Sequence, residues 1–329
     1  MGLEVLSVEL LATVQDLGRQ GTLALGVTSG GAMDPFAHRL GQRLVGNPTS
    51  AAGIEIAQGG FCARALTDLV CCVTGAKVEI AVAQTTGFGG NTNGANAKQI
   101  PQGTAFSLKA GEVLQVSRAH EGVYSYLAVA GGIDTDVVLG SRSTVTREGL
   151  GGHNGRSLRA GDQLPIGEQR GDVPTHTPIA SNLPRQTLTL RYISGFQSDL
   201  AAPEAEGCLT RTTFSVTGAR DRMGVRLKGE PIQTGLETLW SEATCPGAIQ
   251  VPPDGQPIVL LNDRQTMGGY PKLGAVIAPD CIRLAQAPNN AEVVFRRVSP
   301  EEADRVSWLE RQYEFELSRS LNRDGVENK

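Results

Sequence analysis

Apolar residues along this chain fall into short runs rather than long helical stripes. The runs are rich in Val, Ile, Leu and Tyr and are separated by Gly, Asn and Asp, which is typical of β-strands joined by tight turns. Because no helical pattern alternates regularly with the runs, we predict a mainly β protein made of barrels or sandwiches, not a βαβ sheet. The predicted strands are 3–8, 69–73, 78–82, 124–129, 188–193, 258–261 and 292–295.

Two segments depart from this pattern and predict helices. The first has Asp34 as N-cap, Pro35 at the first helical position and Gly46 at its end. The second begins with Ser299 and Pro300 followed by two glutamates, which form a capping box. We expect this C-terminal helix to pack over a barrel or a partner through the apolar residues at helical spacing, which are Val306, Leu309, Tyr313, Leu317 and Leu321.

A polar, proline-marked stretch divides the chain into halves. Residues 167–185 show no hydrophobic period, and we predict an interdomain linker there. The predicted domains are 1–182 and 183–329, in keeping with about 150 residues per domain. The glycine run at 87–94 lacks the G-K-[ST] ending of a phosphate-binding loop, and we predict that it is an exposed hairpin tip.

Composition and charge narrow the class of protein. Hydrophobic residues make up 40% of the 329 residues and aromatic residues 5%, which argues against disorder and against a surface that stacks nucleobases. With 30 basic and 34 acidic residues the net charge is −4, so neither nucleic acid nor a membrane surface is an expected partner. The six cysteines form no C-x-x-C pair, and we expect reduced, mostly buried thiols. Because no stretch approaches 18 apolar residues, we expect a cytoplasmic location. The histidines lack metal-ligand spacing, so no metal site is expected.

Glycine-rich segments that also carry arginine and short polar side chains are the candidates for chemistry. Short side chains let a ligand approach backbone N–H groups, and a guanidinium grips carboxylates and phosphates at two points. Each segment also has a structural alternative, such as a capped helix, a solvated loop or a turn held by an Asp263–Arg264 or neighbouring salt bridge. The segments are 15–19 with 29–34, 140–156, 221–224 and 247–272.

Several of these segments together resemble the KipA-like family, also called the biotin-dependent carboxyltransferase family, the C subunit of 5-oxoprolinase or allophanate hydrolase subunit 2. The resemblance runs in order from Thr13 to Val298, and it implies two cyclophilin-like β-barrel domains. We discount allophanate hydrolysis, because the glycine- and serine-rich amidase motif with its catalytic lysine is missing from the sequence. The segments that carry the resemblance are 13–19, 29–34, 44–47, 130–133, 140–143, 247–252 and 268–272.

The resemblance also implies a function and partners. Members of the family act in a multi-subunit, ATP-dependent 5-oxoprolinase that opens the lactam of 5-oxoproline to glutamate. The implied partners are two further subunits, one KipI-like and one LamB/YcsF-like, with ATP bound at a partner or a shared interface. No biotin is expected on this chain, because no Met is followed by Lys. Two alternatives stay open: the carboxyltransferase half of a biotin-dependent, urea-type carboxylase, and a non-catalytic regulatory module that binds a KipI-like partner.

From the resemblance and the arginine-bearing motifs we predict a cleft between the two barrels that holds a substrate carboxylate and stabilises an oxyanion or phosphorylated lactam. Asp16 or Asp263 is the candidate general base, although either could instead orient an arginine, and Lys272 is a candidate catalytic donor. The candidate substrate-binding residues are Arg19, Ser29, Gly30, Arg142, Ser143, Arg147, Arg222, Gln250, Arg264, Gln265 and Tyr270.

Overall fold

The computed structural model describes residues 2–324 apart from 85–96, 170, 172, 174–182, 184–185, 199 and 237–238. The glycine run predicted as a hairpin tip and most of the predicted linker lie outside the described residues. The chain forms two compact units. The first comprises Met1–Gln20, Gly30–Asn182 and Phe315–Lys329, and the second comprises Gly21–Ser29 and Leu183–Glu314.

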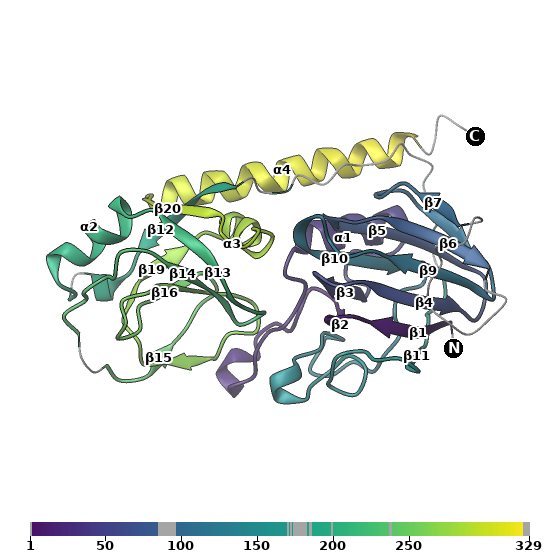
Figure 1. Cartoon of the computed structure of the whole chain (residues 1–329), viewed down its shortest axis with the longest axis horizontal. Coiled ribbons are helices and arrows are strands. Elements are labelled where there is room, and N and C mark those ends of the chain that lie inside the picture. The colour runs from purple at the N-terminus through teal and green to yellow at the C-terminus, as the bar shows by residue number, and fades with distance from the viewer. Residues whose placement is uncertain are drawn as a thin grey trace. The chain divides into compact units, whose positions relative to one another are not determined.

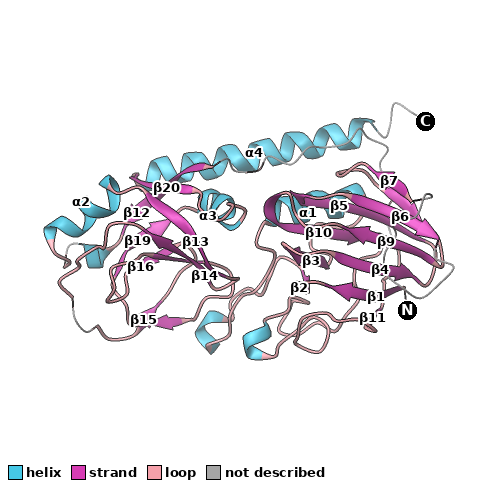
Figure 2. Ribbon diagram, in the orientation of Figure 1, coloured by secondary structure: helices cyan, strands magenta, loops and turns pink. Residues whose placement is uncertain are grey.

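The first unit contains two antiparallel sheets that share one hydrophobic core (Figures 1 and 2). One sheet has the strand order β11-β1-β4-β9-β6-β7 and the other β2-β3-β10-β5-β8. Residues of both sheets, such as Val14, Phe61 and Leu127, are buried in the core between them. The strands are β1 (Leu3–Val8), β2 (Leu11–Gln15), β3 (Gly53–Ala57), β4 (Phe61–Ala65), β5 (Leu69–Lys77), β6 (Ile80–Gln84), β7 (Lys98–Ile100), β8 (Phe106–Leu108), β9 (Glu112–Val116), β10 (Glu121–Val129) and β11 (Gln163–Leu164).

Helix α1 (Pro35–Leu44) belongs to the first unit and begins where the sequence predicts. The Asp34 carboxylate accepts a hydrogen bond from the Ala37 N–H at 3.0 Å, which satisfies one of the amides left free at a helix start. Leu40 and Leu44 are buried where the helix packs on β5 and β10. The N-terminal end of α1 therefore holds the preceding segment 29–34 in place.

The second unit contains a closed barrel with the strand order β12-β19-β16-β17-β14-β13-β20. The pairing of β12 with β20 is parallel and closes the ring. The strands β15 and β18 form a separate two-stranded sheet. The bounds are β12 (Thr187–Ser194), β13 (Phe214–Arg220), β14 (Gly224–Lys228), β15 (Glu242–Ala243), β16 (Ala248–Gln250), β17 (Ile258–Leu260), β18 (Met267–Gly268), β19 (Lys272–Val276) and β20 (Glu292–Arg297).

The second unit also contains two short helices that the sequence pattern did not reveal, α2 (Pro203–Arg211) and α3 (Ala278–Ala285). Each has a proline in its first turn, but the residues at the N-cap positions, Ala202 and Ile277, provide no side-chain hydrogen bond. The usual signal for the start of a helix is therefore incomplete.

The C-terminal helix α4 (Pro300–Asp324) is confirmed, and the Ser299 hydroxyl accepts the predicted capping hydrogen bond from the Glu302 N–H at 3.2 Å. Its apolar stripe is only partly buried. Val306 packs in the second unit and Leu317 in the first, whereas Leu309 and Tyr313 are exposed.

The prediction of a mainly β fold with a C-terminal helix is confirmed. The closed ring lies in the second unit, while the strands described in the first unit form two sheets around one core. Among the described residues, none of the helices is both long enough and apolar enough to span a membrane.

Candidate functional sites in each unit

In the first unit, Asp16 is the centre of a dense group of hydrogen bonds. Its carboxylate accepts hydrogen bonds from the hydroxyls of Ser141 and Ser143, both at 2.6 Å, and from the amides of Arg142 at 2.6 Å and Gly18 at 2.8 Å. Burial opposes ionisation of Asp16, but these hydrogen bonds outweigh it and hold the pKa of this carboxyl below its ordinary value. We call Asp16 with its four donors the Asp16 knot.

Two further motif side chains pack around the Asp16 knot. The Arg19 guanidinium donates to the carbonyl of Ser143 at 2.7 Å and to the carbonyl of Val138 at 3.1 Å. Gly30 has a positive φ of 64°, and a Cβ atom there would lie 3.3 Å from the Ser143 Cβ and 3.4 Å from an Arg19 nitrogen. The predicted residues Asp16, Arg19, Gly30 and Ser143 thus meet, and their contacts hold three chain segments together.

The other two arginines predicted in this unit point elsewhere. The Arg142 side chain pairs with Asp134 at 2.5 Å and lines a cavity of about 490 Å³ beside Gly131 and Gly132. Arg147 is exposed and pairs with its neighbour Glu148 at 3.0 Å. Only the backbone of Arg142 takes part in the Asp16 knot.

In the second unit, Asp263 forms a buried ion pair with Arg222. The two side chains meet through two parallel hydrogen bonds of 2.8 and 2.9 Å, and both are almost completely buried. An Asp263–Arg264 salt bridge, which was one structural alternative for this turn, does not form. Asp263 pairs instead with Arg222, which is 41 positions away in the sequence. This geometry gives Asp263 the role of orienting and neutralising Arg222.

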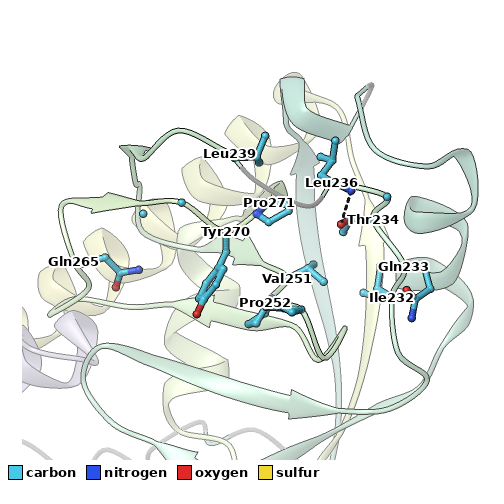
Figure 3. A pocket seen from close by; sticks show the side chains of 14 residues that line it. Ile232, Gln233, Thr234, Leu236, Leu239, Val251, Pro252, Gln265, Tyr270 and Pro271 are labelled. Carbon is cyan, nitrogen blue, oxygen red and sulfur yellow. Dashed lines mark hydrogen bonds between the residues drawn. The ribbon is translucent and has the colours of Figure 1, made fainter.

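A cavity of about 660 Å³ opens in the second unit beside the β15–β18 sheet (Figure 3). In Figure 3 the rings of Tyr270, Pro252 and Pro271 lie together on one wall, and the Gln265 amide lies beyond Tyr270. None of the lining residues that the structure describes carries a charge. The lining residues are Ile232, Gln233, Thr234, Gly235, Leu236, Leu239, Val251, Pro252, Pro253, Gln265, Gly268, Gly269, Tyr270 and Pro271.

Gln265, which lines the cavity, forms a pair of side-chain amides with Gln250. Gln265 Nε2 donates to Gln250 Oε1 at 3.1 Å, and Gln250 is almost completely buried. The Nε2 of Gln250 has no hydrogen-bond partner among the described residues, and a Cβ atom on Gly268 would lie 2.5 Å from it. A side chain at position 268 would therefore displace the Gln250 amide from its present position.

Lys272 lies next to the same wall. Its Nζ is 3.4 Å from the carbonyl oxygen of Gly268 and 3.6 Å from the carboxylate of Glu242. The side chain of Gln197 links the backbone of Lys272 to Glu242. It accepts a hydrogen bond from the Lys272 backbone N–H at 2.7 Å and donates one to the Glu242 carboxylate at 2.6 Å. Four predicted residues, Gln250, Gln265, Tyr270 and Lys272, are thus grouped around this cavity.

The last two predicted residues are Ser29 and Arg264. Ser29 is half-buried at the end of the segment Gly21–Ser29. The preceding residue, Thr28, donates a hydrogen bond from its hydroxyl to the carbonyl of Arg264 at 3.0 Å. The Arg264 side chain is 1% exposed.

Sequence reasoning missed several residues that build these sites. Ser141 lies inside a segment that was singled out, so its role in the Asp16 knot could have been proposed from the motif. Gln197 and Glu242 lie outside every motif and reach the site only through the fold. No local signal identifies them.

Comparison with known proteins identifies the family to which the chain belongs. The family model described as "Carboxyltransferase domain, subdomain A and B" matches residues 25–297. The chain is 34% identical over 323 residues to the 5-oxoprolinase C subunit of Escherichia coli strain K12, covering 98% of this chain and 99% of that protein. The chain therefore belongs to the carboxyltransferase-domain family that includes the C subunit of 5-oxoprolinase.

Solved structures agree with this assignment. The crystal structure of TTHA0988 superimposes with a TM-score of 0.77 at 34% identity, over 90% of this chain and 55% of that chain. The urea amidolyase of K. lactis superimposes with a TM-score of 0.81 at 26% identity, over 92% of this chain and 19% of that chain. This chain thus spans about half of the first protein and about a fifth of the second.

Proposed function

We propose that this chain is the C subunit of a multi-subunit 5-oxoprolinase. The observation that carries the proposal is the 34% identity to the E. coli C subunit over almost the whole of both chains. In the proposed reaction the complex opens the lactam of 5-oxoproline to glutamate at the expense of ATP. We assign ATP hydrolysis to the complex, whose other members would be one KipI-like and one LamB/YcsF-like partner.

We propose that the uncharged cavity of the second unit receives the lactam ring. Its prolines and aliphatic side chains suit the ring methylenes, and the amide of Gln265 provides both a donor and an acceptor for the lactam amide. The Tyr270 ring, which is partly exposed on the cavity wall, would form one face of the binding site. A neutral site favours the amide part of the substrate over its carboxylate.

Lys272 is the candidate catalytic residue that fits this proposal best. The carboxylates of Asp16 and Asp263 are engaged by donors at 2.6 to 2.9 Å, which favours a positioning role for both. The contacts of the Lys272 amine are longer, at 3.4 and 3.6 Å. Such an amine can exchange a weak contact for a stronger hydrogen bond to the carbonyl oxygen of the lactam, where negative charge develops during ring opening.

Complementation tests the proposed function. An E. coli strain that lacks its own C subunit would be supplied with this chain, and hydrolysis of 5-oxoproline to glutamate would be measured in extracts with ATP. We expect activity to return, and to fall about tenfold or more in Tyr270→Ala, because this substitution removes one wall of the ring site. Tyr313→Ala, which removes an exposed tyrosine outside the cavity, is the matched control.

If no activity returns although the chain co-purifies with its two E. coli partner proteins, the assignment is wrong. Equal activity of Tyr270→Ala and wild type would instead refute only the ring site.

Carboxyl transfer is a second candidate function, because the matching family model is that of a carboxyltransferase domain and because the chain superimposes on urea amidolyase. In this proposal the uncharged cavity receives the ureido ring of a carboxybiotin carried by another protein. The discriminating measurement is transfer of labelled carboxylate from carboxybiotin in the complex that hydrolyses 5-oxoproline. Ring opening that proceeds without any such transfer rules this candidate out.

A further inference from the structure

We propose that Arg264 is the anchor of a binding site for a small anion that carries a carboxylate or phosphate group. The inference rests on the surroundings of one side chain and does not depend on the proposed function. It concerns a charged site, in contrast to the uncharged cavity lined by Tyr270.

Arg264 differs from the other deeply buried arginine of the same unit. Arg222 is 5% exposed and is neutralised by two hydrogen bonds to Asp263. Arg264 is 1% exposed, yet within the part of the chain that the structure describes no carboxylate pairs with it and its Nε has no hydrogen-bond partner. The two arginines therefore have similar burial and opposite degrees of charge compensation.

A buried and uncompensated guanidinium is costly. Removing a cation from water is unfavourable unless it is paired or hydrogen-bonded, and burial lowers the pKa of Arg264. An anion that pairs with the guanidinium would offset this cost. The planar fork of donors on a guanidinium matches the two oxygens of a carboxylate or phosphate.

The backbone on both sides of the side chain is fixed in advance. The carbonyl of Arg264 accepts the hydrogen bond from Thr28, which is itself fully buried, and the next carbonyl, that of Gln265, accepts one from the Thr244 hydroxyl. The ligand therefore does not need to order the backbone that carries Arg264, which lowers the entropic cost of binding.

The exposed Cys245 belongs to a segment that is hydrogen-bonded to the residues following Arg264. Thr244, the residue before it, is paired with Gln265 and Thr266, so the segment at 244–245 runs beside Arg264. Cys245 is the exposed cysteine among the six, and because Thr244 before it bonds to Gln265 and Thr266, we expect the Cys245 thiol to be sensitive to the charge of the neighbouring guanidinium. The alkylation rate of the Cys245 thiol can therefore report the charge at Arg264.

The test compares two alkylating reagents at Cys245. The anionic reagent iodoacetate and the neutral reagent iodoacetamide would be used on the full chain, and modification of the Cys245 peptide would be followed by mass spectrometry. Because the positive charge attracts the anionic reagent, we expect the iodoacetate-to-iodoacetamide rate ratio to fall about threefold or more in Arg264→Gln. Arg226→Gln, which removes a half-buried arginine paired with the exposed Asp254, is the control and should keep the wild-type ratio.

Added anions supply the second arm of the test. Millimolar inorganic phosphate, 5-oxoproline or glutamate should lower the wild-type ratio toward that of Arg264→Gln, and should change the ratio of the variant little. Protection by phosphate alone identifies a phosphate site, protection by the two carboxylates alone identifies a carboxylate site, and protection by all three identifies a general anion site.

Arg264→Lys keeps the positive charge but lacks the planar set of donors of a guanidinium. This variant should therefore keep most of the wild-type iodoacetate-to-iodoacetamide rate ratio, while added anions should lower that ratio less than they do in wild type. The wild-type protein alone decides the matter if a variant does not fold. If none of the three anions changes the wild-type ratio, the proposal is overturned. Because the readout is thiol alkylation, this result is separable from a failure of the complementation experiment.

Discussion

The Asp16 knot of the first unit and the surroundings of Arg264 in the second unit handle a buried charge in opposite ways. Four donors engage the Asp16 carboxylate, and its pKa lies below the ordinary value. Arg264 is even more deeply buried, but its Nε has no partner among the described residues. Both lie in segments of the same kind, rich in glycine and short polar residues, so the sequence alone does not separate them.

This difference distinguishes buried polar groups that stabilise the fold from buried polar groups that are available to bind a ligand. A buried charge whose hydrogen bonds are complete stabilises the loops that supply its partners, whereas a buried charge with incomplete hydrogen bonds reduces stability and is available to a ligand. On this criterion the Asp16 knot and the Arg222–Asp263 pair hold the fold together. Arg264 and the amide pair Gln250–Gln265 are positions where a ligand can bind.

The largest effect should come from breaking the Arg222–Asp263 pair. In Asp263→Asn the guanidinium stays buried without its counter-charge, so we expect a loss of about 3–5 kcal/mol in the free energy of unfolding. Hydrogen exchange of peptides from the second unit in increasing denaturant, followed by mass spectrometry, measures this loss.

The matched control for this prediction is Asp254→Asn, which breaks the exposed pair with Arg226 and should cost at most about 1 kcal/mol. Equal losses in the two variants would show that the buried pair is not structural.

A second effect is expected in the first unit from Asp16→Asn. The amide has one acceptor oxygen in place of two, and its NH₂ group faces donors, so at least one buried donor loses its partner. The expected loss is about 1–3 kcal/mol. Hydrogen exchange in denaturant should show a lowered unfolding midpoint for peptides of the first unit, while the midpoint for peptides of the second unit stays in place. A shift confined to the second unit would contradict the assignment.

Much of the fold could be predicted because its signals are local. Strand β1 and the starts of α1 and α4 are set by alternation and capping residues within a few positions of each other. Helices α2 and α3 were missed because the residues at their N-cap positions give no side-chain cap. The two sheets of the first unit depend on pairings between distant strands, which local patterns do not specify.

The sites were predicted less completely, for the same reason. Asp16 and Ser143 were both singled out, but their contact joins residues 127 positions apart. The neighbouring residues Asp263 and Arg264 suggest a salt bridge, yet Asp263 pairs with Arg222. Which of two adjacent charged residues is neutralised depends on the tertiary fold, and this detail distinguishes a structural pair from a candidate binding group.

Acid should weaken the compensated carboxylates of the first unit. Hydrogen bonds from Arg156 lower the pKa of Asp162 to about 2, despite burial, and Asp16 is shifted in the same direction. A carboxyl whose pKa is lower in the folded state stabilises the protein above its unfolded-state pKa and loses this contribution as the pH falls toward the folded-state value. The stability difference between wild type and Asp162→Asn should therefore be constant above pH ~5 and shrink between pH ~4 and pH ~2. A difference that does not change with pH in urea titrations would contradict this account.

The smallest effect, and one of opposite sign, is expected at Arg264. In Arg264→Met an apolar side chain of similar length replaces an uncompensated buried charge, so the free energy of unfolding should stay the same or rise by about 1 kcal/mol. Hydrogen exchange of second-unit peptides in urea measures this free energy, and the same variant should lose protection of Cys245 by anions. Arg222→Met in the same unit is the matched comparison, and it should lose stability because Asp263 is left buried without its partner. A large loss of stability in Arg264→Met would mean that its charge is compensated in the fold after all, and the distinction between the two arginines would fail.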